Sequence, residues 1–259
     1  MQKEFEKFAS AALFEGMTSI RALFAARTEN PQNDRRITRL FFAEESKAKL
    51  KKELLWLSHR AEEDGFPILP LPASELSALA TGNTHGGILA ECTERTVPRL
   101  ADCSTSLPGS GFYALLEGIE DPYNFGYALR SLYAAGVTGV ILPERNWMSA
   151  AGVVARASAG ASELLPVYTA DGIEAADIFH ALEYRVVSAD TRTEVLLPDA
   201  DLSLPLLLIV GGEKRGISRA LLDACDLAVK IPYARDFSAS LSAASATTML
   251  AYEIMRQNR

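Results

Sequence analysis

The chain has 259 residues, of which 48% are hydrophobic and 23% are charged, a balance typical of a globular protein with a buried core. This composition excludes a disordered chain, a collagen-like repeat and a coiled coil. The net charge of −7 argues against a nonspecific coat on nucleic acid. Residues 1–105 carry 14 Lys and Arg against 15 Asp and Glu, whereas residues 106–259 carry 12 against 18, so the acidity lies mainly in the later part.

Three features of the chain bear on its cellular setting. No apolar run approaches the length of a membrane span, and the first residues mix both signs of charge, so we expect neither a membrane anchor nor a secretory signal. The cysteines Cys92, Cys103 and Cys225 are odd in number and lack the spacing of metal ligands. They predict reduced thiols in a cytoplasmic protein, with neither a disulfide framework nor a bound metal.

The first hundred residues mix helical and extended patterns. Apolar residues recur with helical spacing, and a short apolar run between prolines indicates a strand. The expected elements are a helix over 5–13, a long amphipathic helix over 46–63, a strand over 66–69 and a helix over 74–79 with Ser74 as its N-cap.

A run of Ser, Thr, Pro and Gly over 102–111 interrupts these patterns. Such residues favour loops over packed elements. We therefore predict a first domain over 1–104, a linker over 105–110 and a second domain over 111–259.

Strands and helices alternate regularly through the second domain. The strands are apolar on both faces, which is typical of a mostly parallel sheet covered by helices, and the predicted fold class is α/β. The expected extended segments are 112–117, 137–142, 164–168, 185–188, 206–210 and 227–231, and the expected helices are 124–135, 149–157, 173–182, 218–224 and 239–255.

Polar loops follow several of these strands, and ligands of parallel α/β sheets bind at the carboxyl ends of strands. The loop after Glu117 begins a turn with Asp121 and Pro122, and Asn124 could simply cap the next helix. Arg130 lies six residues beyond Asn124, a spacing that could direct it to the same end of the sheet or leave it solvated.

The loop after Val210 places Gly211, Gly212 and Gly216 around Glu213. Such a loop exposes backbone N–H groups to a ligand, although a glycine-rich turn with a solvated Glu213 is the alternative. The glycine order matches neither a phosphate-binding P-loop nor a dinucleotide fingerprint.

The segment 231–242 leaves a strand through Pro232 and enters a helix through a cluster of serines. The simplest interpretation is N-capping by Ser238 or Ser240. The helix then begins with small residues, which permit close approach to the sheet or to a partner subunit. His59, His85 and His180 are scattered, so hydrolase and metalloenzyme chemistry is disfavoured.

Together these loops resemble the three motifs of the SpoU/TrmH branch of the SPOUT RNA methyltransferases. The matching residues are Asp121-Pro-Tyr-Asn124-Phe-Gly126 with Arg130, then Gly211-Gly-Glu213-Lys-Arg-Gly216, then Ile231-Pro232 with Ser240-Leu241, while 156–161 and 165–167 resemble the family's middle region. Ser19–Leu23 and Thr84–Ala90 look like the ends of the family's substrate-binding domain, which has a fold like ribosomal protein L30e.

The resemblance implies methyl transfer from S-adenosylmethionine to a ribose 2′-OH in structured ribosomal or transfer RNA. It also implies a knotted (trefoil) catalytic domain and a homodimer with its sites near the subunit interface. The cofactor would be held largely by backbone groups around Gly211, Gly212, Gly216, Ile231 and Leu241, with Ser188 and Ala189 as weaker candidates.

The same resemblance gives roles to the catalytic candidates Asn124, Arg130, Glu213, Ser240 and Ser242. Arg130 would hold a phosphate and the nascent oxyanion, Asn124 and Glu213 would orient Arg130 and the ribose, and Ser240 would shape the site. Many members have Asn where this chain has Ser242, and the preceding loop is about one residue longer than the common pattern. A catalytically weak RNA-binding member is therefore the alternative function, and methylation of a base nitrogen is a third.

RNA contacts are expected from the first domain. Arg21, Arg35, Arg36 and Arg39 lie in or beside loops and could meet phosphates, although a solvated charge cluster is as good an interpretation. His85 is a further candidate, with a turn residue as its alternative.

Overall fold

A computed structural model describes residues 12–144 and 150–259. By their packing, these residues form two compact units. The N-terminal unit comprises the described residues of 1–96 together with those of 146–164, and the C-terminal unit comprises those of 97–145 and 165–259. Within the described ranges, no helix is long and apolar enough to cross a membrane.

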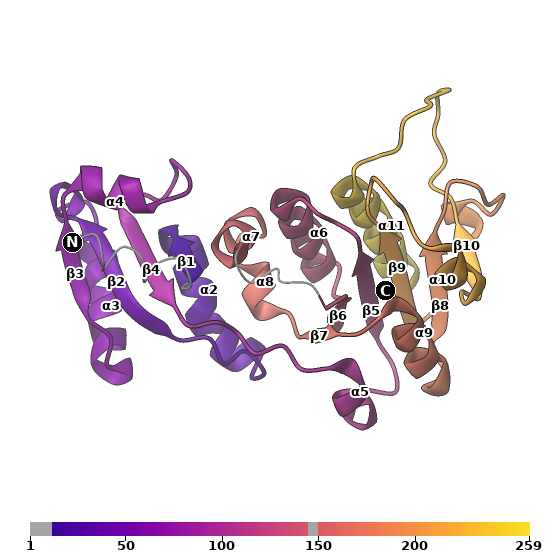
Figure 1. Cartoon of the computed structure of the whole chain (residues 1–259), viewed down its shortest axis with the longest axis horizontal. Helices are drawn as coiled ribbons and strands as arrows, with labels where there is room; N and C mark the ends of the chain where they lie inside the picture. The colour runs from indigo at the N-terminus through magenta and orange to yellow at the C-terminus, as the bar shows by residue number, and fades with distance from the viewer. Residues whose placement is uncertain (1–11, 145–149) are drawn as a thin grey trace. The chain divides into compact units, whose positions relative to one another are not determined.

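The N-terminal unit is built on a four-stranded mixed sheet in the order β1-β4-β2-β3 (Figure 1). β2 and β3 pair in parallel, and the other pairs are antiparallel. Fully buried Phe14, Leu40 and Ile88 from three strands pack with Ile20 and Leu57 from the helices. The elements are β1 (Ala12–Glu15), α2 (Gly16–Glu29), β2 (Ile37–Ala43), η2 (Glu44–Ser46), α3 (Lys51–Asp64), β3 (Ile68–Leu71), α4 (Ala73–Leu79), β4 (Ile88–Cys92), α7 (Ala151–Ala157) and α8 (Ala161–Leu164).

Several predicted elements of this unit are shifted in the structure. The long helix starts at Lys51 instead of residue 46, because a 3-10 turn precedes it, and it ends where Gly65 adopts a left-handed conformation. Ser74 is not the N-cap of α4; Pro72 holds that position, and the Glu45 carboxylate accepts from the backbone N–H of Ala73. Of the helix predicted over 5–13, residues 5–11 lie outside the described residues, and the remainder begins strand β1.

The C-terminal unit contains a six-stranded, all-parallel sheet in the order β10-β8-β9-β5-β6-β7. This arrangement confirms the predicted α/β class. The elements are α5 (Leu100–Cys103), η3 (Ser104–Ser106), β5 (Phe112–Glu117), α6 (Pro122–Ala134), β6 (Gly139–Leu142), β7 (Val167–Thr169), α9 (Gly172–Ala181), β8 (Arg185–Ala189), η5 (Leu197–Asp199), β9 (Leu206–Gly211), α10 (Arg219–Asp223), β10 (Leu227–Val229) and α11 (Ala243–Gln257).

Helices cover both faces of this sheet, which explains why its strands carry no polar alternation. On one face, Tyr113 and Ile209 pack against Phe179 of α9 and Leu221 of α10. Successive strand residues point to opposite faces, and α11 packs on β9 and beside α6 (Figure 1). Because all six strands are parallel, their carboxyl ends lie at one edge of the sheet, where the loops singled out from the sequence begin.

Residues 150–164 pack with the N-terminal unit, although they stand between β6 and β7 in the chain. A Cβ on Gly152 of α7 would lie 1.8 Å from the carbonyl oxygen of Leu13 in β1, so helix and strand backbones are in close contact. The predicted substrate-binding domain over 1–104 and catalytic domain over 111–259 stay predictions about function. The compact units have other boundaries, because the first is interrupted after residue 96 and resumes before α7.

Candidate active site

Two glycine-containing loops are pressed together at the carboxyl edge of the parallel sheet. The backbone N–H of Gly212 donates to the carbonyl of Glu117, with a nitrogen–oxygen distance of 2.6 Å. A Cβ on Gly212 would lie 1.9 Å from the carbonyl oxygen of Gly118, so no other residue fits without backbone movement. This close approach fixes the loop after β9 against the loop after β5.

The Glu213 carboxylate links all three segments that the sequence singled out. Its Oε1 accepts from Nδ2 of Asn124 at 2.9 Å and from the backbone N–H of Ala243 at 3.2 Å. Asn124 lies in the first turn of α6, and Ala243 is the first residue of α11. The carboxylate therefore lies at the N-terminus of α11, where the helix dipole favours negative charge.

Two side chains other than those expected cap these helices. The Asp121 carboxylate accepts from the backbone N–H of Asn124 at 2.8 Å, which leaves the Asn124 side chain free to bind Glu213. At α11 the cap is Ser242, which accepts from the backbone N–H of Ser245 at 3.2 Å. The predictions of a cap at Asn124, Ser238 or Ser240 are therefore wrong, and α11 begins at residue 243 instead of residue 239.

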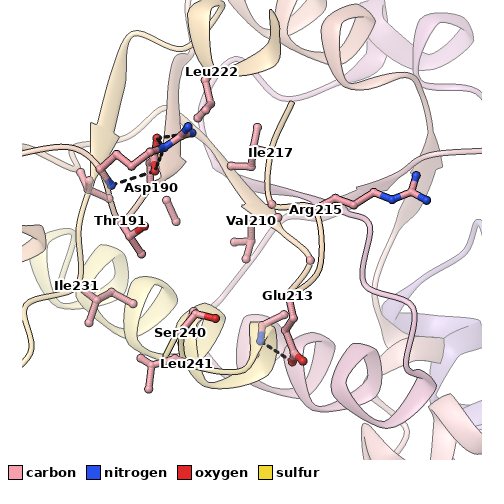
Figure 2. Close-up of a pocket in the computed structure, with 18 of the residues that line it drawn as sticks. Asp190, Thr191, Val210, Glu213, Arg215, Ile217, Leu222, Ile231, Ser240 and Leu241 are labelled. Carbon is pink, nitrogen blue, oxygen red and sulfur yellow. Dashed lines mark hydrogen bonds and ion pairs between the residues drawn. The ribbon is translucent and has the colours of Figure 1, made fainter. Parts of the chain in front are cut away.

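A cavity of about 400 Å³ opens beside this junction (Figure 2). It is lined by backbone of the glycine loop, by apolar side chains and by a few polar groups. Six of the seven predicted cofactor residues line it: Ala189, Gly211, Gly212, Gly216, Ile231 and Leu241. The seventh, Ser188, does not line it, and its side chain is fully buried within β8. Glu213 and Ser240 of the catalytic set also border the cavity.

A charged pair at the mouth of the cavity was missed from the sequence. Asp190 follows β8 and binds Arg192 through its carboxylate, with Oδ1 3.0 Å from Nε. Hydrogen bonds from the side chain and backbone of Arg192 lower the pKa of Asp190 below its usual value, so the carboxylate stays ionised. The rule that ligands meet the carboxyl ends of strands, applied to β8 beyond Ala189, would have found both residues.

Arg130 takes no part in the hydrogen bonds that join Asn124, Glu213 and Ala243. It is exposed on α6 and does not line the cavity. Within the described part of the chain its guanidinium has no ion-pair or hydrogen-bond partner. In the single chain Arg130 is therefore solvated, and its direction toward the active site stays a prediction.

The cationic candidates of the N-terminal unit lie in different settings. Arg21 lies over the ring of Trp56, with its guanidinium carbon 5.9 Å from the ring centroid. Arg36 is exposed, and its guanidinium donates to the carbonyl of Arg35 at 2.9 Å. Arg39 forms an ion pair with Glu91. Arg21 and Arg36 therefore keep surface charge, whereas that of Arg39 is largely neutralised.

His85 forms a local turn contact. Its ring Nδ1 accepts from the backbone N–H of Gly87 at 3.2 Å, in a turn where Gly86 and Gly87 have left-handed backbone. His85 is therefore a turn residue, and a contact with RNA stays a prediction.

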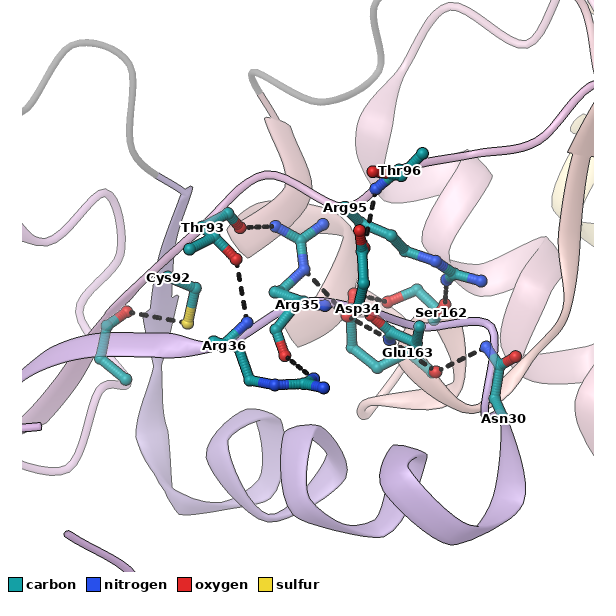
Figure 3. A network of polar contacts seen from close by, with 12 residues as sticks. Asn30, Asp34, Arg35, Arg36, Cys92, Thr93, Arg95, Thr96, Ser162 and Glu163 are labelled. Carbon is teal, nitrogen blue, oxygen red and sulfur yellow. Dashed lines mark hydrogen bonds and ion pairs between the residues drawn. The ribbon is translucent and has the colours of Figure 1, made fainter. Parts of the chain in front are cut away.

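Arg35 is buried in an ion pair (Figure 3). Its Nε lies 3.0 Å from Oε2 of Glu163, and the two side chains are 2% and 4% exposed. Asn33 donates to the same Oε2 at 2.9 Å, and the carbonyl of Thr93 accepts from Arg35 at 2.7 Å. This network fastens α8 to the loop before β2, so the charge of Arg35 is satisfied inside the unit.

Among the described residues, no group of three or more His, Cys, Asp or Glu side chains is placed to hold a metal ion. The half-buried Glu117 carboxyl at the end of β5 has a raised pKa, first because burial disfavours its charge and then because Asp171 is nearby.

Comparison with known proteins identifies the family to which this chain belongs. Residues 111–252 match the model of the SpoU rRNA methylase family. The Bacillus subtilis protein YacO, named as a TrmH family tRNA/rRNA methyltransferase, is 28% identical over 88% of this chain and 92% of its own. A Mycolicibacterium paratuberculosis protein named as a tRNA/rRNA methyltransferase is 33% identical over 77% of this chain and 65% of its own.

A solved structure shares the fold over nearly the whole chain. The SpoU methyltransferase AviRb from Streptomyces viridochromogenes, in complex with the cofactor AdoMet, superposes with a TM-score of 0.77. The match covers 97% of this chain and 92% of AviRb, at 23% identity.

Replacing Gly212 by Ala should destabilise the C-terminal unit, because the new Cβ would meet the Gly118 carbonyl, which is backbone and cannot rotate away. We expect a loss of roughly 1–3 kcal/mol, the usual cost of overpacking, measured by thermal unfolding followed by circular dichroism. Gly109→Ala is the matched control, since a Cβ there meets nothing within 4 Å. Equal unfolding temperatures for the two variants would contradict the close approach.

Glu163→Ala should destabilise the N-terminal unit by about 3–5 kcal/mol, because it leaves the buried Arg35 without its counter-charge. In a Trp147→Phe background, Trp56 is the remaining tryptophan, and its fluorescence during urea unfolding reports on this unit. The exposed Glu62→Ala is the control, with an expected change below about 0.5 kcal/mol. A similar small change for Glu163→Ala would mean that the ion pair contributes nothing to this unit.

Proposed function

The chain belongs to the SpoU rRNA methylase family, and we propose that it transfers a methyl group from S-adenosylmethionine to a ribose 2′-hydroxyl of structured ribosomal or transfer RNA. The observation that carries this proposal is the junction at Glu213, where the three family motifs meet beside a cavity of about 400 Å³.

The cavity suits S-adenosylmethionine in size and in chemistry. Its volume lies within the range of pockets that hold small molecules. Ile231 and Leu241 offer an apolar surface to a flat adenine ring, and Asp190 is an ionised acceptor for ribose hydroxyls. Gly211 and Gly212 present only backbone to this cavity, so their polar backbone groups are the ones that the cofactor would meet there.

S-adenosylmethionine supplies a methyl group that is already activated by a sulfonium centre. The chain's own residues must then position the 2′-hydroxyl and stabilise the negative charge that develops on it. Glu213 and Asn124 hold each other at 2.9 Å, so the ribose would meet a fixed pair. Ser240, on the rim of the cavity, and Ser242, at the cap of α11, complete the proposed set.

Arg130 is suited to binding the phosphate beside the target ribose and the developing oxyanion. A guanidinium is a poor base, so it would not accept the hydroxyl proton itself. Deprotonation would be assisted by the RNA. The absence of an internal partner for Arg130 among the described residues leaves its charge available for this role.

The N-terminal unit supplies a second contact surface in this proposal. Exposed Arg21 and Arg36 would meet phosphates of the structured RNA. We infer a cytoplasmic protein, because Cys92, Cys103 and Cys225 are free thiols.

Arg130→Ala should lower methyl transfer by about 10²-fold, the loss typical of removing one oxyanion-stabilising donor, and leave cofactor affinity unchanged. The assay follows labelled methyl from S-adenosylmethionine into pooled ribosomal and transfer RNA, with alkaline digestion of the product. Label should appear in alkali-resistant dinucleotides, since only a 2′-O-methyl group protects the next phosphodiester.

Arg185→Ala is the matched control, because Arg185 is exposed at the opposite end of the parallel sheet. Label in alkali-labile nucleotides would show base methylation instead. Absence of both methyl transfer and cofactor binding in the unaltered protein would favour the non-catalytic RNA-binding alternative.

We also infer a homodimer formed through α6 and α11. Tyr127 and Arg130 on α6, and Met249 and Tyr252 on α11, are exposed with helical spacing. The Ser131 and Thr248 hydroxyls, 2.7 Å apart, join the two helices at this surface. Exposed Tyr, Met and Arg side chains of this kind are enriched at protein interfaces. This homodimer would bring Arg130 into the interface region.

Tyr252→Glu should convert the dimer to a monomer, because it places a carboxylate in the apolar part of this face. Sedimentation velocity measures the change as a halving of the mass. Leu55→Glu, at an exposed apolar position of the N-terminal unit, should leave the mass unchanged. An unaltered protein that sediments as a monomer, or a dimeric Tyr252→Glu variant, would contradict this interface.

A further inference from the structure

The segment between β10 and α11 forms a long loop that extends from the end of the sheet (Figure 1). Every residue from 232 to 240 is exposed. The loop begins at Lys230, directly after β10, and ends at Ser242, which caps α11. The role proposed above uses only its two ends, Ile231 and Ser240–Ser242.

Two aromatic rings stand exposed in this loop. Tyr233 is 37% exposed and Phe237 is 58% exposed, and their ring centroids lie 6.1 Å apart. The Tyr233 hydroxyl accepts from the backbone N–H of Leu241 at 3.2 Å, which ties one ring to the base of the loop. Two rings at this distance form one exposed aromatic surface, of the kind that ligand-binding sites present.

The rings line a second cavity, of about 500 Å³, together with Lys230 and Arg235. Thr191, Ile231, Tyr233 and Ser240 line both this cavity and the one assigned to the cofactor, so the two are neighbours.

The charge of this second cavity suits a polyanion. Its lining carries two cations, Lys230 and Arg235, and one anion, Asp236, a net charge of +1 in a part of the chain that is acidic overall. Among the described residues, neither cation has an ion-pair partner. Exposed aromatic rings next to cations without ion-pair partners are the combination by which proteins bind single-stranded nucleic acid.

We propose that Tyr233 and Phe237 form a stacking site for an unpaired base of the RNA substrate, next to the nucleotide whose ribose is methylated. Lys230 and Arg235 bind the phosphates that flank this base. The inference rests on the proposed function, because it takes the occupant of the neighbouring cavity to be the methyl donor. Stacking is tolerant of base identity, so the site selects for unpaired RNA over duplex and not for one sequence.

The test compares Phe237→Leu, which keeps apolar bulk but removes the ring, with Phe237→Trp, which keeps a stacking surface. The probe is a fluorescein-labelled, mixed-sequence single-stranded oligoribonucleotide, with its perfectly paired duplex for comparison, and binding to the full chain is followed by fluorescence anisotropy. Phe237→Leu should weaken single-strand binding by roughly tenfold, Phe237→Trp should not, and duplex binding should be the same for all.

Cofactor affinity is measured on the same variants by calorimetry with S-adenosylmethionine. It should be unchanged, because Phe237 does not line the cofactor cavity. A proportional loss of cofactor affinity in Phe237→Leu would mean that the ring covers the cofactor, and would overturn the proposal. Unchanged single-strand affinity would also overturn it.

Methyl transfer to pooled RNA separates this inference from the proposed function. If the unaltered protein methylates ribose and Phe237→Leu has the same KM for RNA, the stacking site is wrong and the function stands. If no RNA is methylated but the ring still governs single-strand binding, the function is wrong and the RNA site stands.

Discussion

One carboxylate holds the site of the C-terminal unit together. Glu213 binds Asn124 of α6 and the first backbone N–H of α11, so three segments spread over some hundred and twenty residues meet at a single group. The carboxylate can reach both partners only because Gly212 lets its loop lie against Gly118 without a side chain between them. The starts of two helices and one wall of the cavity thus depend on a backbone contact and a charge at a helix terminus.

In the N-terminal unit, too, one carboxylate joins segments that are remote in the chain, and there it is buried. Arg35 and Glu163 are 128 residues apart and nearly inaccessible, and Asn33 shares the same carboxylate oxygen. A buried ion pair contributes less to stability than its Coulomb attraction suggests, because both charges lose their hydration. Its hydrogen bonds are directional, however, so it selects one placement of α8 over others of similar apolar burial.

Apolar patterning was enough to predict every strand of the parallel sheet, because strands buried on both faces stand out as continuous apolar runs. It missed β1, β2 and β4, whose charged residues Glu15, Arg39 and Glu91 break the pattern and are paired only in three dimensions. The loops at the carboxyl edge were identified correctly, but a sequence does not tell which serine caps a helix. Nor does it mark Arg35 as buried, since its partner is remote in the chain.

The chain passes from one unit to the other and back, because residues 150–164 complete the N-terminal unit after β5 and β6 have been synthesised. During synthesis, the first unit is therefore complete only after Glu163 has left the ribosome. By then two strands of the second sheet, β5 and β6, have already been synthesised and are exposed. Domains that close through such remote contacts fold slowly and pass through states with unpaired strand edges. The order of folding is thus interleaved, and a nascent chain halted near residue 100 would have α2 and α3 but would lack α7 and α8, which complete the first unit.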